Sequence, residues 1–206
     1  MYQRFIKRPF DFILSLIATV LLSPLLLGLA LAVKLDSKGP VFFRQKRVGL
    51  HKKHFTMLKF RTMLITAPHD VPTHLLEDPE QYISRVGRFL RKSSLDELPQ
   101  LFNILAGQMS IVGPRPALWN QFDLIEERDK VGANDVRPGL TGLAQISGRD
   151  ELEIPVKAAF DGEYAGNIGL GMDIRCILGT IKSVLGHEGI VEGGTGTLNK
   201  QKEQNN

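Results

Sequence analysis

Residues 12–33 read FILSLIATVLLSPLLLGLALAV, an uncharged and almost wholly apolar segment with Ser23 and Pro24 at its centre. As one helix it would measure about 33 Å at about 1.5 Å per residue, enough to cross a hydrocarbon core of about 30 Å. Pro24 breaks such a helix because it has no N–H to donate to the Val20 carbonyl and its ring clashes with that carbonyl. A serine hydroxyl can satisfy backbone groups that the break frees. The segment therefore predicts a membrane-inserted helix broken at Ser23 and Pro24.

Both flanks of this segment are basic, with Arg4, Lys7 and Arg8 before it and five more Lys and Arg in residues 34–47. The positive-inside rule places both ends on the cytoplasmic side of a membrane. A single span cannot do this, whereas a re-entrant helix-break-helix can. Two alternatives stay open. They are an ordinary span kinked at proline, and a signal peptide cleaved after residues 30–32, although the apolar segment exceeds the roughly 7 to 15 residues of a signal core.

The chain of 206 residues has room for one domain beside this membrane element. Its net charge of +4 is unevenly spread, because residues 1–61 hold 12 Lys and Arg against Asp11 and Asp36, and the remainder is acidic. Anionic lipid headgroups attract Lys and Arg by about 1 kcal/mol each. The basic part therefore predicts contact with anionic lipid headgroups or with an anionic lipid-linked substrate. A solvated face or a nucleic-acid patch is the alternative, and no nucleic-acid partner is expected.

Beyond the membrane segment, the apolar pattern predicts a small β-hairpin and several helices. Val41 to Phe43 and Phe55 to Phe60 flank Gly49 as two short strands. Helical patterns run from Ile83 to Leu90 and from Leu98 to Leu105. An amphipathic stripe follows near the C-terminus, at Ile174, Ile177, Leu178, Ile181 and Leu185. Core packing is the default explanation of this stripe, and a position in the membrane interface is the alternative.

Two regions carry little specific information. Residues 67–80 are rich in proline and acids, and their two histidines, His69 and His74, lack the helical spacing of a zinc site, so a solvated loop is expected. Residues 193–206 are polar and begin Gly-rich, which predicts a disordered tail.

Cys176 is the single cysteine, which excludes an intramolecular disulfide and fits a reducing compartment.

The chemistry is expected in SSLDELPQLFN, residues 93–103. Ser94 and Glu97 have the spacing of a capping box, so a structural role as a helix cap is one interpretation. The other follows from nearby cations, because Arg88, Arg91 and Lys92 come before this segment and Gly113-Pro114-Arg115-Pro116 comes after it. Two prolines around Arg115 restrict the backbone and suit the guanidinium for phosphate recognition. A carboxylate among these cations is expected to have a depressed pKa, and could ligate Mg²⁺ or attack phosphorus.

The ordered blocks carry more information than any one of them alone. They are Lys7-Arg8-x-x-Asp11, Ser23-Pro24, Lys59-Phe60-Arg61-Thr62-Met63, Leu95-Asp96-Glu97-Leu98-Pro99-Gln100-Leu101-Phe102-Asn103, Gly113-Pro114-Arg115-Pro116 and Asp135-Val136-Arg137-Pro138-Gly139-x-Thr141-Gly142. In this order they resemble the small monotopic phosphoglycosyl transferases, also called bacterial sugar transferases. The resemblance covers nearly the whole chain.

The resemblance implies an enzyme that transfers a sugar 1-phosphate from a UDP-sugar to polyprenol phosphate, such as undecaprenyl phosphate, and releases UMP. Asp96 would be the nucleophile that forms an aspartyl-phosphosugar and would also contact Mg²⁺, the expected cofactor. Glu97 would support it. The further positions implied to bind phosphate or shape the site are Lys59, Arg88, Arg115, Arg149, Asp161 and, ranked lower, Arg137. This would be the first membrane step of bacterial glycoconjugate biosynthesis, with an N-acetylated hexose as the first candidate sugar.

Together these arguments predict an α+β fold, mostly helical, with a re-entrant membrane segment, amphipathic interfacial helices and a small β-hairpin. We expect a re-entrant membrane helix at 1–38, a catalytic domain at 39–192 and the tail at 193–206, on the cytoplasmic face of the bacterial inner membrane. Two other classes stay open. A basic, non-enzymatic membrane adaptor would not explain the Asp96-Glu97 and Pro-Arg-Pro blocks, and a secreted hydrolase would require cleavage after Ala32.

Overall fold

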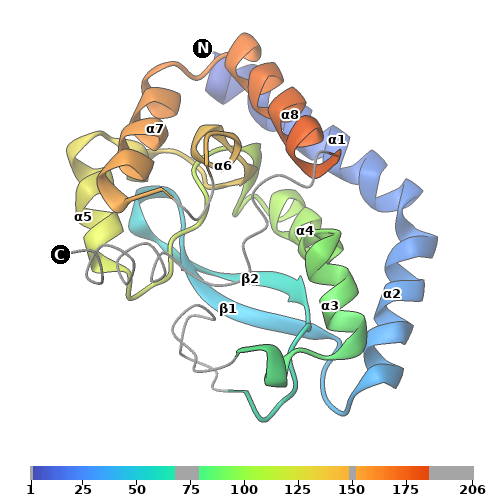
Figure 1. The fold of residues 1–206 in the computed structure, drawn as a ribbon. Coiled ribbons are helices and arrows are strands. Elements are labelled where there is room, and N and C mark those ends of the chain that lie inside the picture. Colours follow the sequence, from blue (N-terminus) through green and yellow to red (C-terminus); the bar gives the residue numbers. More distant parts are fainter. Residues whose placement is uncertain (1, 68–78, 149–151, 186–206) are drawn as a thin grey trace, which may run out of the picture.

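The computed structural model describes residues 2–67, 79–148 and 152–185 (Figure 1). The predicted tail at 193–206, the site residue Arg149 and most of the predicted loop at 67–80 lie outside this part of the chain. The helical elements are η1 (Gln3–Lys7), α1 (Arg8–Leu21), α2 (Ser23–Asp36), η2 (Leu50–Lys52), η4 (Pro79–Tyr82), α3 (Arg85–Lys92), η5 (Leu95–Glu97), α4 (Gln100–Leu105), α5 (Phe122–Lys130), η6 (Ala133–Asp135), α6 (Leu143–Ile146), α7 (Ile154–Gly166) and α8 (Leu170–Leu185). The strands are β1 (Phe42–Val48), β2 (His54–Phe60), β3 (Ser110–Val112) and β4 (Gly139–Thr141).

The predicted α+β fold, mostly helical with a small β-hairpin, is confirmed. Strands β1 and β2 pair antiparallel with Phe42 opposite Phe60, and Lys59 lies opposite Phe43. Sequence reasoning missed a second, parallel pair formed by β3 and β4. That pair is short, and its glycine-containing strand β4 lacks the alternating pattern by which strands are recognised.

Helices α1 and α2 are bent by 64° with respect to each other, at the predicted break. Pro24 lies in the first turn of α2, and the Ser23 hydroxyl donates a hydrogen bond to the Val20 carbonyl at 2.7 Å. Serine thus satisfies the carbonyl that Pro24 cannot reach, as the sequence predicted. None of the described helices is by itself long and apolar enough to cross a membrane, although the two bent helices meet that test together.

The outer face of the bent pair is apolar and exposed, whereas its inner face packs on the rest of the molecule. Leu26, Leu29 and Val33 of α2 are buried against Phe60 of β2 and Leu90 of α3. The largest exposed apolar side chains of α1 and α2 are those of Phe10, Phe12, Ile13, Leu16, Ile17, Val20, Leu21, Leu25, Leu27, Leu31 and Leu35. Such a large exposed apolar surface is typical of a site of membrane or protein contact.

Helix α8 lies beside the first residues of the chain (Figure 1), where the Tyr2 hydroxyl donates to Asp173 at 2.9 Å and Lys7 Nζ of η1 donates to it at 2.8 Å. Cys176 is buried in this helix, and Ile177 packs against the same cluster. The default expectation of core packing is wrong for Ile174, Leu178 and Ile181, which are 46%, 60% and 50% exposed. The reason is that α8 has only one packed face, and these three residues lie on the other.

Candidate active site

The Asp96-Glu97 pair lies on η5, a single turn between α3 and α4. Ser94, just before it, has a left-handed backbone (φ 56°) and its side chain makes no capping hydrogen bond. The capping-box interpretation of Ser94 and Glu97 is therefore wrong. A non-glycine residue in this conformation costs about 1 kcal/mol or more, and such residues are concentrated at functional sites.

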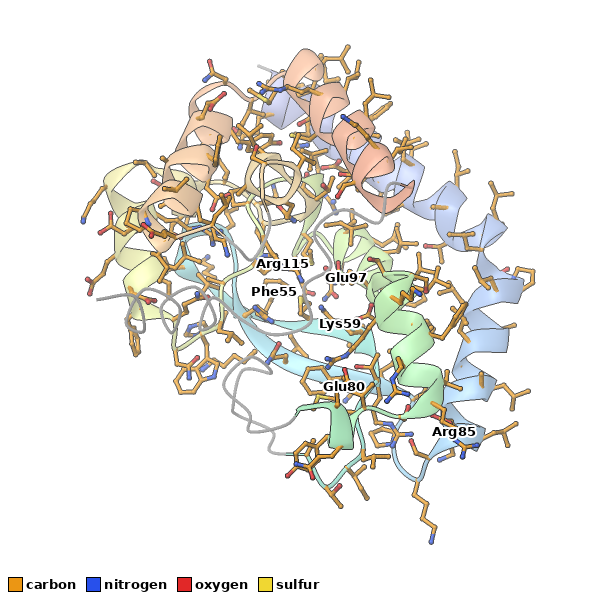
Figure 2. All side chains as sticks on the ribbon, in the orientation of Figure 1. Phe55, Lys59, Glu80, Arg85, Glu97 and Arg115 are labelled. Atoms are coloured by element: carbon orange, nitrogen blue, oxygen red, sulfur yellow. The ribbon has the colours of Figure 1, made fainter. Side chains whose placement is uncertain are left out.

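Glu97 binds two cations that come from different parts of the chain. Its Oε1 accepts a hydrogen bond from Lys59 Nζ at 2.8 Å and another from Arg115 Nη2 at 2.9 Å. Figure 2 shows the three side chains close together beside β2. The structure thus brings together three of the predicted site residues, although they are far apart in the sequence.

Asp96 lies at the edge of this cluster and contacts it only through a long ion pair with Lys59. Its carboxylate is 4.0 Å from Lys59 Nζ, and it accepts no hydrogen bond from any residue that the structure describes. The residue is 9% exposed. The Asp96 oxygens therefore keep their capacity to accept hydrogen bonds within the described structure.

The pKa shifts of the two acids differ from the expectation. Burial raises the pKa of Asp96, and the neighbouring Glu97 raises it further, more than Lys59, Arg91 and Arg115 lower it. For Glu97, burial also acts to raise the pKa, but Arg115 and Lys59 together bring it well below its ordinary value. The prediction of a depressed pKa for Asp96 is wrong, first because burial raises that pKa and also because the cations donate their hydrogen bonds to Glu97.

Lys59 is positioned by a side-chain clamp between β2 and α4. The Asn103 amide donates to the Thr56 carbonyl at 2.8 Å, and the Leu58 backbone N–H donates to Asn103 Oδ1 at 3.0 Å. Asn103 is 3% exposed. The clamp binds the strand on both sides of Met57 and so ties the strand that carries Lys59 to α4, the helix that follows η5.

The loop that carries Arg115 is fixed by backbone contacts. The Gly113 N–H donates to the Thr141 carbonyl, and the Gly139 N–H donates to the Pro114 carbonyl, both at 2.8 Å. A Cβ atom at Gly113 would collide with the Arg137 carbonyl, so a side chain does not fit at this close approach. Behind the loop, Arg128 Nη2 donates to the Arg115 carbonyl at 3.0 Å.

Three of the other predicted residues bind partners outside the cluster of Lys59, Glu97 and Arg115. Arg88 is exposed and pairs with Glu80 at 3.2 Å. Asp161 is 1% exposed and is bound by Arg128. Arg137 donates to the Gly107 carbonyl at 3.1 Å. Sequence reasoning missed Arg128. This arginine lies in an otherwise ordinary amphipathic helix, and that position alone does not indicate a functional role.

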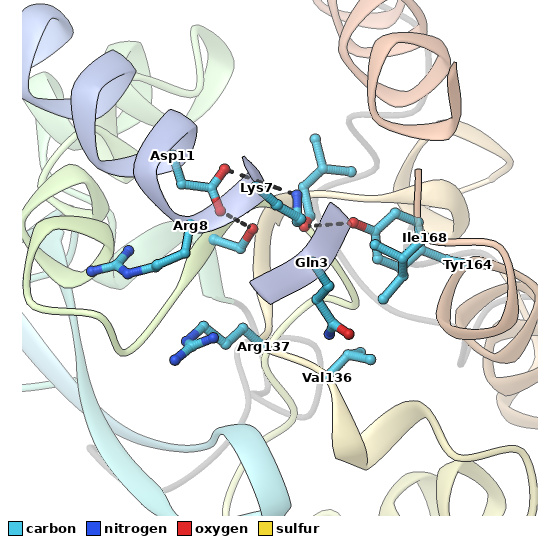
Figure 3. Close-up of a pocket in the computed structure, with 10 residues that line it drawn as sticks. Gln3, Lys7, Arg8, Asp11, Val136, Arg137, Tyr164 and Ile168 are labelled. Atoms are coloured by element: carbon cyan, nitrogen blue, oxygen red, sulfur yellow. Dashed lines mark hydrogen bonds and ion pairs between the residues drawn. The ribbon is translucent and has the colours of Figure 1, made fainter. Parts of the chain in front are cut away.

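A second polar cluster joins the start of α1 to α7 and α8, and Figure 3 shows the small pocket that it lines. Lys7 Nζ lies 2.8 Å from Asp173 and 3.9 Å from Asp11. The Tyr164 hydroxyl lies 2.8 Å from Asp173 Oδ1. The Lys7-x-x-x-Asp11 block thus anchors the first helix to the domain. Arg8 and Arg137 also line this pocket. Arg8 donates to the Ile104 carbonyl at the end of α4, and Arg137 donates to the Gly107 carbonyl just after that helix.

A magnesium site made only of protein carboxylates is not present, since no group of three or more His, Cys, Asp or Glu in the described residues could hold a metal. Mg²⁺ is commonly bound through one or two carboxylates together with substrate phosphates. Asp96 fits that mode, because its oxygens accept no hydrogen bond from the described residues.

The chain is similar in sequence to known proteins. A family model described as bacterial sugar transferase matches residues 2–187. The chain is 40% identical to the uncharacterized sugar transferase EpsL of Bacillus subtilis, over 90% of each protein. It is 37% identical to the undecaprenyl-phosphate galactose phosphotransferase of Salmonella typhimurium, over 91% of this chain and 42% of that protein. It is 43% identical to the UDP-glucose:undecaprenyl-phosphate glucose-1-phosphate transferase of Xanthomonas campestris, over 86% of this chain and 38% of that protein. The chain therefore spans about two fifths of the latter two relatives.

Proposed function

The chain belongs to the bacterial sugar transferase family, and we propose that it transfers a sugar 1-phosphate from a UDP-sugar to polyprenol phosphate and releases UMP. The observation that carries this proposal is the Asp96 carboxylate, which accepts no hydrogen bond from the described residues and lies beside two cations held by Glu97. A nucleophile and fixed positive charges are what phosphoryl transfer requires. The names of the Salmonella and Xanthomonas relatives support an undecaprenyl-phosphate acceptor.

In the first step, an ionised Asp96 oxygen attacks the phosphorus that bears the sugar. The bond between this phosphorus and the bridging oxygen breaks, and UMP leaves with that oxygen and its electron pair. An aspartyl-phosphosugar remains. In the second step an oxygen of polyprenol phosphate attacks the same phosphorus, the acyl-phosphate bond breaks, and Asp96 is regenerated with polyprenol diphosphate sugar as product.

The surrounding residues position charge for both steps. Lys59 and Arg115 lie where they can bind phosphate oxygens, and Glu97 orients both cations through its Oε1. The raised pKa of Asp96 makes its carboxylate more basic, and so a better nucleophile once it is ionised. Mg²⁺, held by Asp96 and the substrate diphosphate, would supply further positive charge to the phosphate oxygens.

The direct test is a UMP-release assay on purified protein with undecaprenyl phosphate and Mg²⁺. The donors are UDP-glucose, UDP-galactose and UDP-N-acetylglucosamine, because the names of the relatives contain glucose and galactose and the family resemblance points to an N-acetylated hexose. We expect UMP from at least one donor, and continued turnover only when the acceptor is present. Release of UDP would instead indicate direct glycosyl transfer and contradict the proposal.

We also propose that the bent pair α1 and α2 enters the membrane from the cytoplasmic side and returns to it. The exposed apolar face of α1 and α2, and the exposed residues Ile174, Leu178 and Ile181 of the neighbouring α8, support this seating. An amphipathic helix buries its apolar face about 5 to 10 Å into the interface. This places the site at the bilayer surface, where a soluble UDP-sugar can meet the phosphate of an acceptor whose tail stays in the lipid.

This topology predicts a labelling result. Cysteines introduced at Gln3 and Lys38, both exposed, are expected to react with a membrane-impermeant maleimide only after the cytoplasmic face is opened. The background is low because Cys176 is fully buried. Labelling of either position from outside intact spheroplasts would show that α1 and α2 form a kinked span instead.

A further inference from the structure

A buried ion pair joins α5 to α7 behind the loop that carries Arg115. Arg128 of α5 and Asp161 of α7 are 3% and 1% exposed. Asp161 Oδ2 accepts a hydrogen bond from Arg128 Nε at 2.8 Å and another from Arg128 Nη2 at 2.6 Å. Figure 1 shows the two helices side by side at one end of the molecule.

The same Arg128 guanidinium also binds the loop. Its Nη2 donates to the Arg115 carbonyl at 3.0 Å, while the Arg115 side chain reaches to Glu97 on the other side. Pro114 and Pro116 restrict the backbone around this carbonyl. Arg128 therefore fixes the main chain at the residue whose side chain enters the candidate site.

The geometry of the ion pair indicates that the loop sets the orientation of Arg128. Arginine and carboxylate frequently pair through two parallel bonds to two different oxygens. Here both bonds go to Oδ2, and Asp161 Oδ1 is buried without a hydrogen-bond partner in the described structure. A buried acceptor without a partner is costly, so an ion pair with a purely structural role would be expected to rotate into the parallel arrangement.

We infer that Arg128 is a positioning residue that holds Arg115 toward Glu97, and that Asp161 acts through Arg128 rather than by touching the substrate. This inference rests on the proposed function for its kinetic consequence. Its structural content, a tether on the loop at Gly113 to Pro116, is independent of that function.

The kinetic test uses the donor that the wild-type enzyme turns over fastest. Arg128→Met combined with Asp161→Leu removes both charges, and replacing a buried ion pair by apolar residues of similar volume is often neutral for stability. We expect this double variant to fold, with kcat lowered about 30-fold and KM for the donor changed less, because the loss falls on transition-state contacts. The single variant Arg128→Lys retains the positive charge but not the planar guanidinium. Its kcat is expected to lie between those of the double variant and the wild type. Wild-type kcat in the folded double variant would overturn the inference.

A second comparison asks whether Arg128 acts through Arg115. We expect Arg115→Ala added to the double variant to lower kcat no further than Arg115→Ala does alone, because residues that act as a unit are not additive. If the fold-losses in kcat of the double variant and of Arg115→Ala multiply when they are combined, Arg128 acts independently of Arg115. Lys130→Gln, which replaces an exposed cation two positions along the same helix, is the matched control and should retain wild-type kcat.

Hydrogen–deuterium exchange tests the tether without any substrate. In the double variant, the Gly113 amide, which donates to the Thr141 carbonyl, is expected to exchange at least about 10-fold faster, with α5 and α7 nearly unchanged. Equal exchange in the loop would refute the tether. If no UDP-sugar is turned over, the proposed function fails while this measurement still decides whether Arg128 holds the loop.

Discussion

Asp96→Asn is expected to lower UMP release by at least about 10³-fold while the protein stays folded and membrane-bound. An amide is a far poorer nucleophile and Mg²⁺ ligand than a carboxylate. The fold should tolerate the change, because Asp96 accepts no hydrogen bond from the described residues and Ser94, not Asp96, precedes the turn. The pKa of Asp96 is raised, so at neutral pH its charge disfavours the folded state, and the neutral Asn should leave the melting temperature equal or higher.

A covalent signature should accompany this loss. Incubated with UDP-sugar and Mg²⁺ but no acceptor, the wild-type protein should release one equivalent of UMP and gain the mass of one sugar phosphate on the peptide that contains Asp96. The Asn variant should gain none. Substantial steady-state UMP release by Asp96→Asn with acceptor present would remove Asp96 as nucleophile and favour direct attack by polyprenol phosphate.

The local parts of this structure could be predicted because they depend on neighbouring residues. The break at Ser23 and Pro24 follows from a missing N–H and a nearby hydroxyl, and the structure forms that hydrogen bond to Val20. The hairpin likewise follows from alternating apolar residues around a glycine. In both cases the determining residues belong to one continuous stretch of sequence, residues 20–24 for the break and residues 42–60 for the hairpin.

The distribution of charge in the site could not be predicted, because it depends on contacts between distant segments. Lys59 and Arg115 were expected near the acidic pair, but sequence does not say which carboxylate they bind. Both donate hydrogen bonds to Glu97, and the burial of Asp96 together with the charge of Glu97 raises the pKa of Asp96 instead of lowering it. Arg128 was missed for the same reason, since its role depends on the packing of α5 against α7 and the loop.

The exposed stripe on α8 shows a different limit. A period of three to four apolar residues identifies one face of a helix, but not what covers that face. Cys176 and Asp173 lie on the packed side, while Ile174, Leu178 and Ile181 face outward. Composition alone left core packing and the membrane interface as alternatives, and the structure shows that these three residues are not packed in the core.

Glu97→Gln is expected to lower kcat/KM at neutral pH by roughly 10²-fold, and to shift the pH dependence of the activity that remains. The loss arises because the neutral amide would carry no negative charge to hold Lys59 and Arg115 in their present positions. The shift arises because the negative charge of Glu97 is one of the causes that raise the pKa of Asp96. Its removal should therefore lower that pKa.

The direction in which the pH dependence shifts follows from the protonation state in which Asp96 reacts. Only the ionised carboxylate attacks phosphorus, so kcat/KM of the wild-type enzyme should fall as pH decreases through the raised pKa of Asp96. In Glu97→Gln this decline should begin at lower pH, although the plateau is lower. Glu127→Gln, which removes an acid paired with the exposed Lys130, is the matched control and should change neither the plateau nor the acidic limb. An acidic limb that stays in place, or moves to higher pH, would mean that Glu97 does not set the charge of Asp96.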